Sequence, residues 1–286
     1  MQEYMRLVII AIILCMVSSA GCSKMQQVEE TAIQNAISKE MALEREDQNS
    51  SDALPVEIID SSVDVLIYAG KSLWIRQEHA IIEADITKQL LESEDIQVGI
   101  TESKESVRDW MLKTTGNGVV NVCILYGILP STIYASGNAQ PDGSVVENWI
   151  ETTDGDTVLN HADYFGYNSS EGQANERGAM QNLMDLPDIE INVYEHNIGM
   201  FVTEEGRTLT PSLGNFGSDR PFPLDELDAD WFAEKVLATD AQGILADPII
   251  VRDGDRGRLA IVFHTLYKND PKGEVAAEII KYLLTE

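Results

Sequence analysis

Apolar and polar positions along residues 62–286 alternate in blocks that have the periods of strands and helices in turn. Residues 63–69 and 119–126 are apolar-rich runs, each followed by a glycine, as is typical of strands buried on both faces. Between them, residues 78–91 carry apolar side chains at helical spacing, and Ser103 is a suitable N-cap for a helix that ends near Lys113. This alternation predicts a parallel sheet covered by helices.

The second half of the chain continues the pattern. Further strands are expected at 96–100, 157–160, 189–193, 247–251 and 258–263, and further helices at 144–151, 178–185, 227–238 and 274–284. Residues 203–224 have no clear period and are expected to form an elaborated loop. The expected fold is α/β, with a doubly wound, mostly parallel sheet that has an antiparallel edge.

Residues 1–22 have the features of a bacterial lipoprotein signal. Arg6 precedes an apolar run at 7–17, which is shorter than the roughly 20 residues that cross a membrane. Residues 19–22 read Ser-Ala-Gly-Cys and resemble a lipobox, with Ser19 where leucine is usual. The sequence therefore predicts export, lipidation of Cys22 and attachment to the cell envelope. The alternative is an ordinary cleaved signal that leaves Cys22 as a free thiol.

Composition limits the classes of partner. Residues 23–60 are expected to form an acidic, helical or flexible tether, and residues 61–286 are long enough for one domain. The net charge of −28 repels nucleic acid. Cys123 lies within an apolar run, where a thiol behaves as a small buried hydrophobe. We expect no internal disulfide, metal or cofactor.

Candidate chemistry lies where the predicted parallel strands end, because open parallel sheets bind ligands beyond the carboxyl ends of their strands. His161 and Asp163 follow the strand at 157–160, and residues two apart on an extended chain share a face. A carboxylate in that position can orient an imidazole for proton transfer. His264 follows the last strand and would supply a second imidazole. We hypothesise that these residues are catalytic; the alternative is that both histidines are partly buried and bonded to backbone carbonyls.

Polar groups near the same edge are suited to a small polar ligand. Hydroxyl and amide groups beside an aromatic ring match a sugar, which needs hydrogen bonds and an apolar face. The candidate ligand-binding residues are Tyr134, Asn138, Asn160 and Tyr164. The alternative for the loop at 130–142 is a solvated connection held by its own Asn and Asp side chains.

Two segments resemble the ThuA-like (trehalose-utilisation) family, which is similar to the class I glutamine amidotransferase superfamily. The first is the turn at Gly155, the strand after it and His161, which matches the histidine that the family has at the superfamily's nucleophile position. The second is the Gly-Arg-Leu-Ala-Ile segment from Gly257, followed by His264. The resemblance extends over roughly residues 62–285, although the family's doubled glycine is reduced to Gly155.

The resemblance implies a class I glutamine amidotransferase-like, or flavodoxin-like, fold and a role in carbohydrate metabolism, with a sugar derivative as the ligand. The alternative is a non-catalytic envelope scaffold for protein contacts. The chain has no Gly-x-Ser-x-Gly motif, which suits the scaffold hypothesis and disfavours that type of serine hydrolase.

Overall fold

The computed structural model describes residues 62–73, 75–161, 164–191, 197–228, 230–262 and 270–285. The chain divides into two compact units, Met1–Pro55 and Val56–Glu286, and all the described residues belong to the second unit. The predicted signal and tether, with Cys22, lie outside the described residues, as do Asp163 and His264. Within the described part, no helix is long and apolar enough to cross a membrane.

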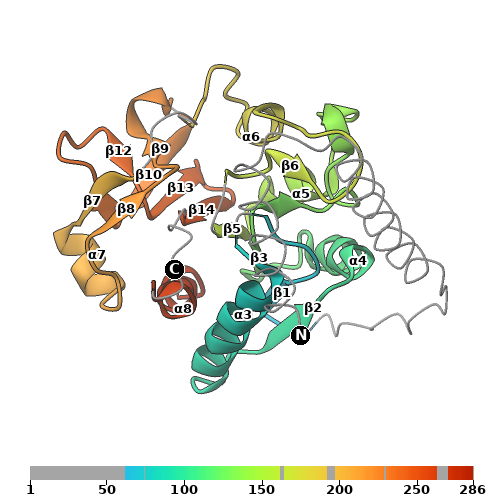
Figure 1. The fold of residues 1–286 in the computed structure, drawn as a ribbon. Coiled ribbons are helices and arrows are strands. Elements are labelled where there is room, and N and C mark those ends of the chain that lie inside the picture. The colour runs from blue at the N-terminus through green and yellow to red at the C-terminus, as the bar shows by residue number, and fades with distance from the viewer. Residues whose placement is uncertain are drawn as a thin grey trace, which may run out of the picture. The chain divides into compact units, whose positions relative to one another are not determined.

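A seven-stranded sheet forms the centre of this unit, in the order β10-β13-β14-β5-β3-β1-β2 (Figure 1). Its strands are β1 (Val65–Tyr68), β2 (Val98–Thr101), β3 (Val122–Leu125), β5 (Thr157–His161), β10 (Trp231–Val236), β13 (Ile249–Asp253) and β14 (Arg258–Val262). The five strands β14, β5, β3, β1 and β2, neighbours in that order, pair in parallel. At the other edge, β13 pairs antiparallel with β14, and β10 pairs antiparallel with β13. The predicted α/β fold with a mostly parallel sheet and an antiparallel edge is confirmed.

Helices pack against both faces of the central sheet. The helices are α3 (Gln77–Glu92), α4 (Lys104–Thr114), α5 (Val145–Ile150), α6 (Gly178–Leu183) and α8 (Lys272–Leu283). On β1, Leu66 packs in one core cluster with Trp110 of α4, whereas Val65 packs in another with Ala84 of α3 and Ile280 of α8. Successive side chains of a strand point to opposite faces, so one strand feeds both clusters.

Local sequence explains where two of the helices begin. Ser103 precedes α4, and its hydroxyl accepts a hydrogen bond from the backbone N–H of Ser106 at 3.1 Å. Ser144 precedes α5 and forms a reciprocal capping box with Glu147. The Ser103 N-cap agrees with the prediction from the sequence, and α5 lies within the predicted helix at 144–151.

A second, five-stranded sheet has the order β8-β7-β11-β12-β9. Its strands, with the helical turns beside them, are β7 (Ile198–Val202), α7 (Glu204–Leu209), β8 (Phe216–Ser218), β9 (Phe222–Pro223), η2 (Leu224–Glu226), β11 (Ala238–Thr239) and β12 (Leu245–Ala246). Two of its strands, β8 and β9, and the helix α7 lie within residues 203–224, which were expected to form an irregular loop, so that expectation was wrong. Its strands are too short to give a readable period. A small parallel ribbon joins β4 (Ile128–Leu129) to β6 (Asn168–Ser169), and η1 (Ser136–Asn138) lies between them in sequence.

Two further predictions were wrong. The expected helix at 227–238 is the edge strand β10, which pairs antiparallel with β13. Ala233, Glu234 and Lys235 favour a helix locally, but pairing along the sheet edge decides the conformation. No strand forms at Ile189 or Ile191, although both side chains are buried in the core. Alternating apolar positions there serve packing without a partner strand.

Candidate functional site

His161 is the last residue of β5 and is fully buried, with 0% of its surface exposed. The parallel register pairs it with Val262, the last residue of β14. The two strands therefore end side by side at the same edge of the sheet. Asp163 and His264 can meet only if β5 and β14 end side by side, as they do here. Because both residues lie outside the described part, their contact with His161 stays a prediction.

The ring of His161 lies between a backbone carbonyl and an aromatic ring. Its Nε2 atom is 3.3 Å from the carbonyl oxygen of Lys272, and its ring centroid is 5.2 Å from that of Tyr126. A bond to a backbone carbonyl is what the structural alternative for this histidine predicts. Tyr126 follows β3 and is 1% exposed. Burial raises the pKa of the Tyr126 hydroxyl, and the nearby charge of Glu83 raises it further.

Charged groups surround the start of α8. Lys272 has a buried side chain, whose Nζ lies 3.3 Å from Oδ2 of Asp270. Glu83 of α3 accepts a hydrogen bond from the backbone N–H of Gly273 at 2.7 Å. Burial lowers the pKa of Lys272, and the charge of Asp270 opposes this effect. Burial also raises the pKa of Glu83, while the Gly273 bond opposes it.

These residues form what we call the strand-end cluster: His161, Tyr126, Glu83, Lys272 and Asp270. It joins the carboxyl ends of β3 and β5 to the N-terminus of α8 and to the middle of α3. A Cβ atom at Gly273 would lie 2.8 Å from the carbonyl oxygen of Glu83. Glycine is therefore needed where α8 approaches α3.

Two of the predicted ligand-binding residues bond to other protein groups. The Tyr134 hydroxyl donates to Oδ1 of Asn138 at 2.9 Å and accepts from Nδ2 of Asn182 at 2.6 Å. Nδ2 of Asn138 in turn donates to the carbonyl of Asn175 at 2.8 Å. Tyr134 is 1% exposed, and burial raises its pKa. Only the Tyr134–Asn138 bond lies within the loop at 130–142, whereas the other two join the loop to Asn175 and Asn182.

The other two predicted ligand-binding residues are also buried. Asn160 lies within β5 at 1% exposure, and Tyr164 is 2% exposed. The Tyr164 hydroxyl accepts from the backbone N–H of Ile191 at 3.3 Å, and its ring lies 5.2 Å from that of Tyr167. Phe165 is fully buried beside it in sequence. The structure thus packs Tyr164 and Phe165 into one core cluster.

Sequence reasoning missed Glu83, Tyr126 and Lys272. A signal existed for Glu83, which lies three residues after Ala80 and four before Thr87, on the face of α3 that is buried. A carboxylate on an apolar helix face is uncommon and requires a partner. Nothing in the sequence near Lys272 shows that its carbonyl meets His161, because that contact comes from tertiary packing.

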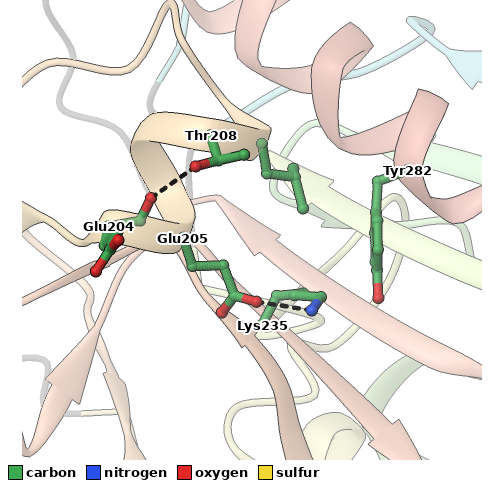
Figure 2. A pocket seen from close by; sticks show the side chains of 6 residues that line it. Glu204, Glu205, Thr208, Lys235 and Tyr282 are labelled. Atoms are coloured by element: carbon green, nitrogen blue, oxygen red, sulfur yellow. Dashed lines mark hydrogen bonds and ion pairs between the residues drawn. The ribbon is translucent and has the colours of Figure 1, made fainter.

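A pocket of about 500 Å³ lies elsewhere in the unit, between α7, β10 and the C-terminal end of α8 (Figure 2). Its lining consists of Glu204, Glu205, Thr208, Leu209, Lys235 and Tyr282. Tyr282 lies ten residues after Lys272 on α8, which places the two about 15 Å apart along the helix axis. The pocket is therefore separate from the strand-end cluster. No group of three or more side chains that could hold a metal ion occurs among the described residues.

Comparison with known proteins gives a distant structural likeness. Neither a protein-family model nor a curated protein sequence matches the chain. A crystal structure from Bacteroides uniformis, described as that of a ThuA-like protein, matches with a TM-score of 0.47 and 11% sequence identity. The match covers 78% of this chain and 91% of that chain. At this level of likeness no residue role passes from that protein to this one.

Proposed function

We propose that this domain binds a small polar ligand beside His161, at the carboxyl ends of β3, β5 and β14. The observation that carries the proposal is the strand-end cluster, in which an imidazole, a phenol, an ammonium and a carboxylate are all largely buried. Burying such polar and charged groups costs free energy, whereas burying apolar side chains does not. Their gathering at the edge where open parallel sheets bind ligands is typical of a functional site.

In this proposal Asp163 and His264 complete the site, since they follow the adjacent ends of β5 and β14. His161 then exchanges a proton with the ligand through one ring nitrogen while the Lys272 carbonyl holds the other, and Asp163 is a second acid–base group. The ligand is a sugar derivative and the domain takes part in carbohydrate metabolism, as the resemblance to ThuA-like proteins implies. The fold is then the doubly wound one of class I glutamine amidotransferases. A lipid on Cys22 holds the domain at the cell envelope.

Calorimetry with the full chain in mild detergent tests the site. The titrants are monosaccharides, disaccharides and sugar acids. Asp163→Asn keeps side-chain size, and His161→Asn keeps a polar side chain without the titratable ring. Both should weaken binding about tenfold or more, because each removes a charged or proton-exchanging contact. His79→Ala, on α3 and partly exposed, is the control. Binding that is equal in all the variants would exclude His161 and Asp163 as ligand contacts.

A second function, that of a non-catalytic scaffold for protein contacts, is favoured by the packing of the neighbouring loop. Tyr134, Tyr164 and Phe165 are at most 2% exposed and lie in one core cluster. Aromatic side chains held in the core are not available as ligand contacts, so this loop offers fewer of them than the sequence predicted. A chain with both Asn substitutions that still rescues a deletion strain, although it binds no sugar, would favour the scaffold.

A further inference from the structure

The pocket between α7, β10 and α8 combines an ion pair with an aromatic ring. Nζ of Lys235 lies 2.7 Å from Oε1 of Glu205 and 5.3 Å from the ring centroid of Tyr282. Figure 2 shows Glu205 and Lys235 meeting between α7 and Tyr282, with the Tyr282 ring standing beside them. An anion, a cation and a ring face are therefore within reach of one small molecule.

The ring of Tyr282 is held in place from behind. Its hydroxyl donates to Oε1 of Glu234 at 2.7 Å, and Oε2 of Glu234 accepts from Nε of Arg258 at 2.8 Å. The Arg258 side chain is 1% exposed and also donates to the carbonyl of Gly155 at 3.2 Å. A buried ion pair thus anchors the residue that forms one wall. Anchoring of this kind reduces the entropy lost when a ligand packs on the ring.

The side chains that line the pocket carry two carboxylates, of Glu204 and Glu205, and one ammonium, of Lys235. Glu205 and Lys235 neutralise each other, and Glu204 is exposed, so water and salt screen its charge. Glu205 accepts hydrogen bonds and Lys235 donates them, so adjacent hydroxyl groups of one ligand can bond to both. Leu209 and the Tyr282 ring offer apolar surface for the C–H face of a sugar ring.

We propose that this pocket binds a neutral polyhydroxyl compound, such as a sugar, independently of the strand-end cluster. Vicinal hydroxyls bridge Glu205 and Lys235 without breaking their ion pair, while the ligand's apolar face stacks on Tyr282. An amino acid would have to displace that ion pair before both of its charges could bind, and the other carboxylate of the lining, of Glu204, is exposed to water and attracts an amine only weakly. A neutral ligand therefore binds without the free-energy cost of breaking the Glu205–Lys235 ion pair.

Titration calorimetry on the full chain tests this proposal with glucose, galactose, mannose, N-acetylglucosamine and maltose. At least one sugar should bind with a dissociation constant of roughly 0.1–5 mM, as expected for an open site of this size. Tyr282→Leu should weaken binding about tenfold through loss of stacking, and Lys235→Met by a similar factor through loss of the donor. Tyr282→Phe keeps the ring and should restore affinity to within about threefold of the wild type.

Lys281→Met is the matched control, because Lys281 is also paired with a glutamate, Glu94, but does not line the pocket. Thermal unfolding of each variant shows that it is folded. Lys235 is partly exposed, so Lys235→Met keeps the test valid if Tyr282→Leu unfolds. The proposal is overturned if none of the sugars binds, if putrescine or leucine binds here instead, or if Lys235→Met binds like Lys281→Met. Sugar binding lost in His161→Asn but kept in Lys235→Met would move the ligand to the strand-end site.

Discussion

The Nε2 atom of His161 lies 3.3 Å from the carbonyl oxygen of Lys272, 111 residues further along the chain. The contact ties the end of a central strand to the first residue of the last helix. The imidazole is fully buried, and a buried polar group without a partner costs free energy, so the carbonyl stabilises the ring in this position. The imidazole thus has a structural task even if it also touches a ligand.

His161→Ala should therefore lower the free energy of unfolding by about 2–4 kcal/mol, from lost packing and from the carbonyl left without its ring partner. Urea unfolding followed by circular dichroism measures this loss. His79→Ala, which is partly exposed on α3, should cost less than about 1 kcal/mol. An equal effect of the two substitutions would show that His161 does not stabilise the strand-end cluster.

The central sheet could be predicted because its strands are buried runs with regular helices between them. β1 and β3 lie in continuous apolar runs, and α3 has apolar side chains at helical spacing over several turns. β10 could not be read, since its Ala-Glu-Lys segment has local helix propensity and only pairing with β13 reveals a strand. The five-stranded sheet was missed because several of its strands are only two residues long.

The sequence predicted a location for the candidate site but not the contacts of its residues. Residues at strand ends follow from the rule for open parallel sheets, and that rule selected His161. Its described contacts, Lys272 and Tyr126, depend on how α8 and β3 pack against β5. Such contacts join segments far apart in sequence, and no local period encodes them. Tyr134 and Asn138 were predicted as ligand contacts, whereas the hydrogen bond that joins them to each other appears only in the folded loop.

The surroundings of the Asp156 carboxyl group favour its protonated, neutral form. It is fully buried at the start of β5, where Oδ1 accepts from the backbone N–H of Asn121 at 2.8 Å. Oδ2 has no hydrogen-bond partner among the described residues. Burial raises the pKa of Asp156 to about 8, and the charge of Asp154 adds to the rise. Between about pH 4 and pH 8 the unfolded chain loses this proton and the folded chain keeps it, so stability falls as pH rises.

Asp156→Asn should remove this pH-dependent cost. The amide keeps an oxygen for the Asn121 N–H and has no charge to bury. We expect the variant to exceed the wild type in unfolding free energy by roughly 2 kcal/mol or more at pH 8, and to match it near pH 4. Urea titrations across this range measure the difference. A gap between the two proteins that does not grow with pH would contradict the assignment.

Substitutions of Glu83 can separate two contributions to the stability of α8: its hydrogen bond to the Gly273 N–H and its negative charge. Its carboxylate accepts from the Gly273 N–H at 2.7 Å, and burial raises its pKa. Glu83→Gln keeps an acceptor and should change stability by less than about 1 kcal/mol at neutral pH. Glu83→Ala leaves the N–H without this acceptor and should cost about 1–2 kcal/mol more. Chemical unfolding compares the two, and equal losses would show that the bond to Gly273 does not stabilise α8.

Trp110 and Trp149 are buried in the same core cluster, and the hydroxyl of Thr114 accepts a hydrogen bond from Trp149. Nε1 of Trp149 donates to Oγ1 of Thr114 at 2.9 Å, and the Trp149 ring centroid lies 5.6 Å from that of Trp110. Thr114→Val conserves shape but leaves a buried indole N–H without its acceptor, which should cost about 1–3 kcal/mol.

Thr114→Ser is the matched control for that substitution. It keeps the hydroxyl and loses one methyl group, so it should cost only about 1 kcal/mol. Unfolding in urea, followed by tryptophan fluorescence, gives both values, and near-ultraviolet circular dichroism reports whether the ring pair keeps its geometry. If serine destabilised the protein as much as valine, the methyl group would be the important contact and the hydrogen bond to Trp149 would contribute little.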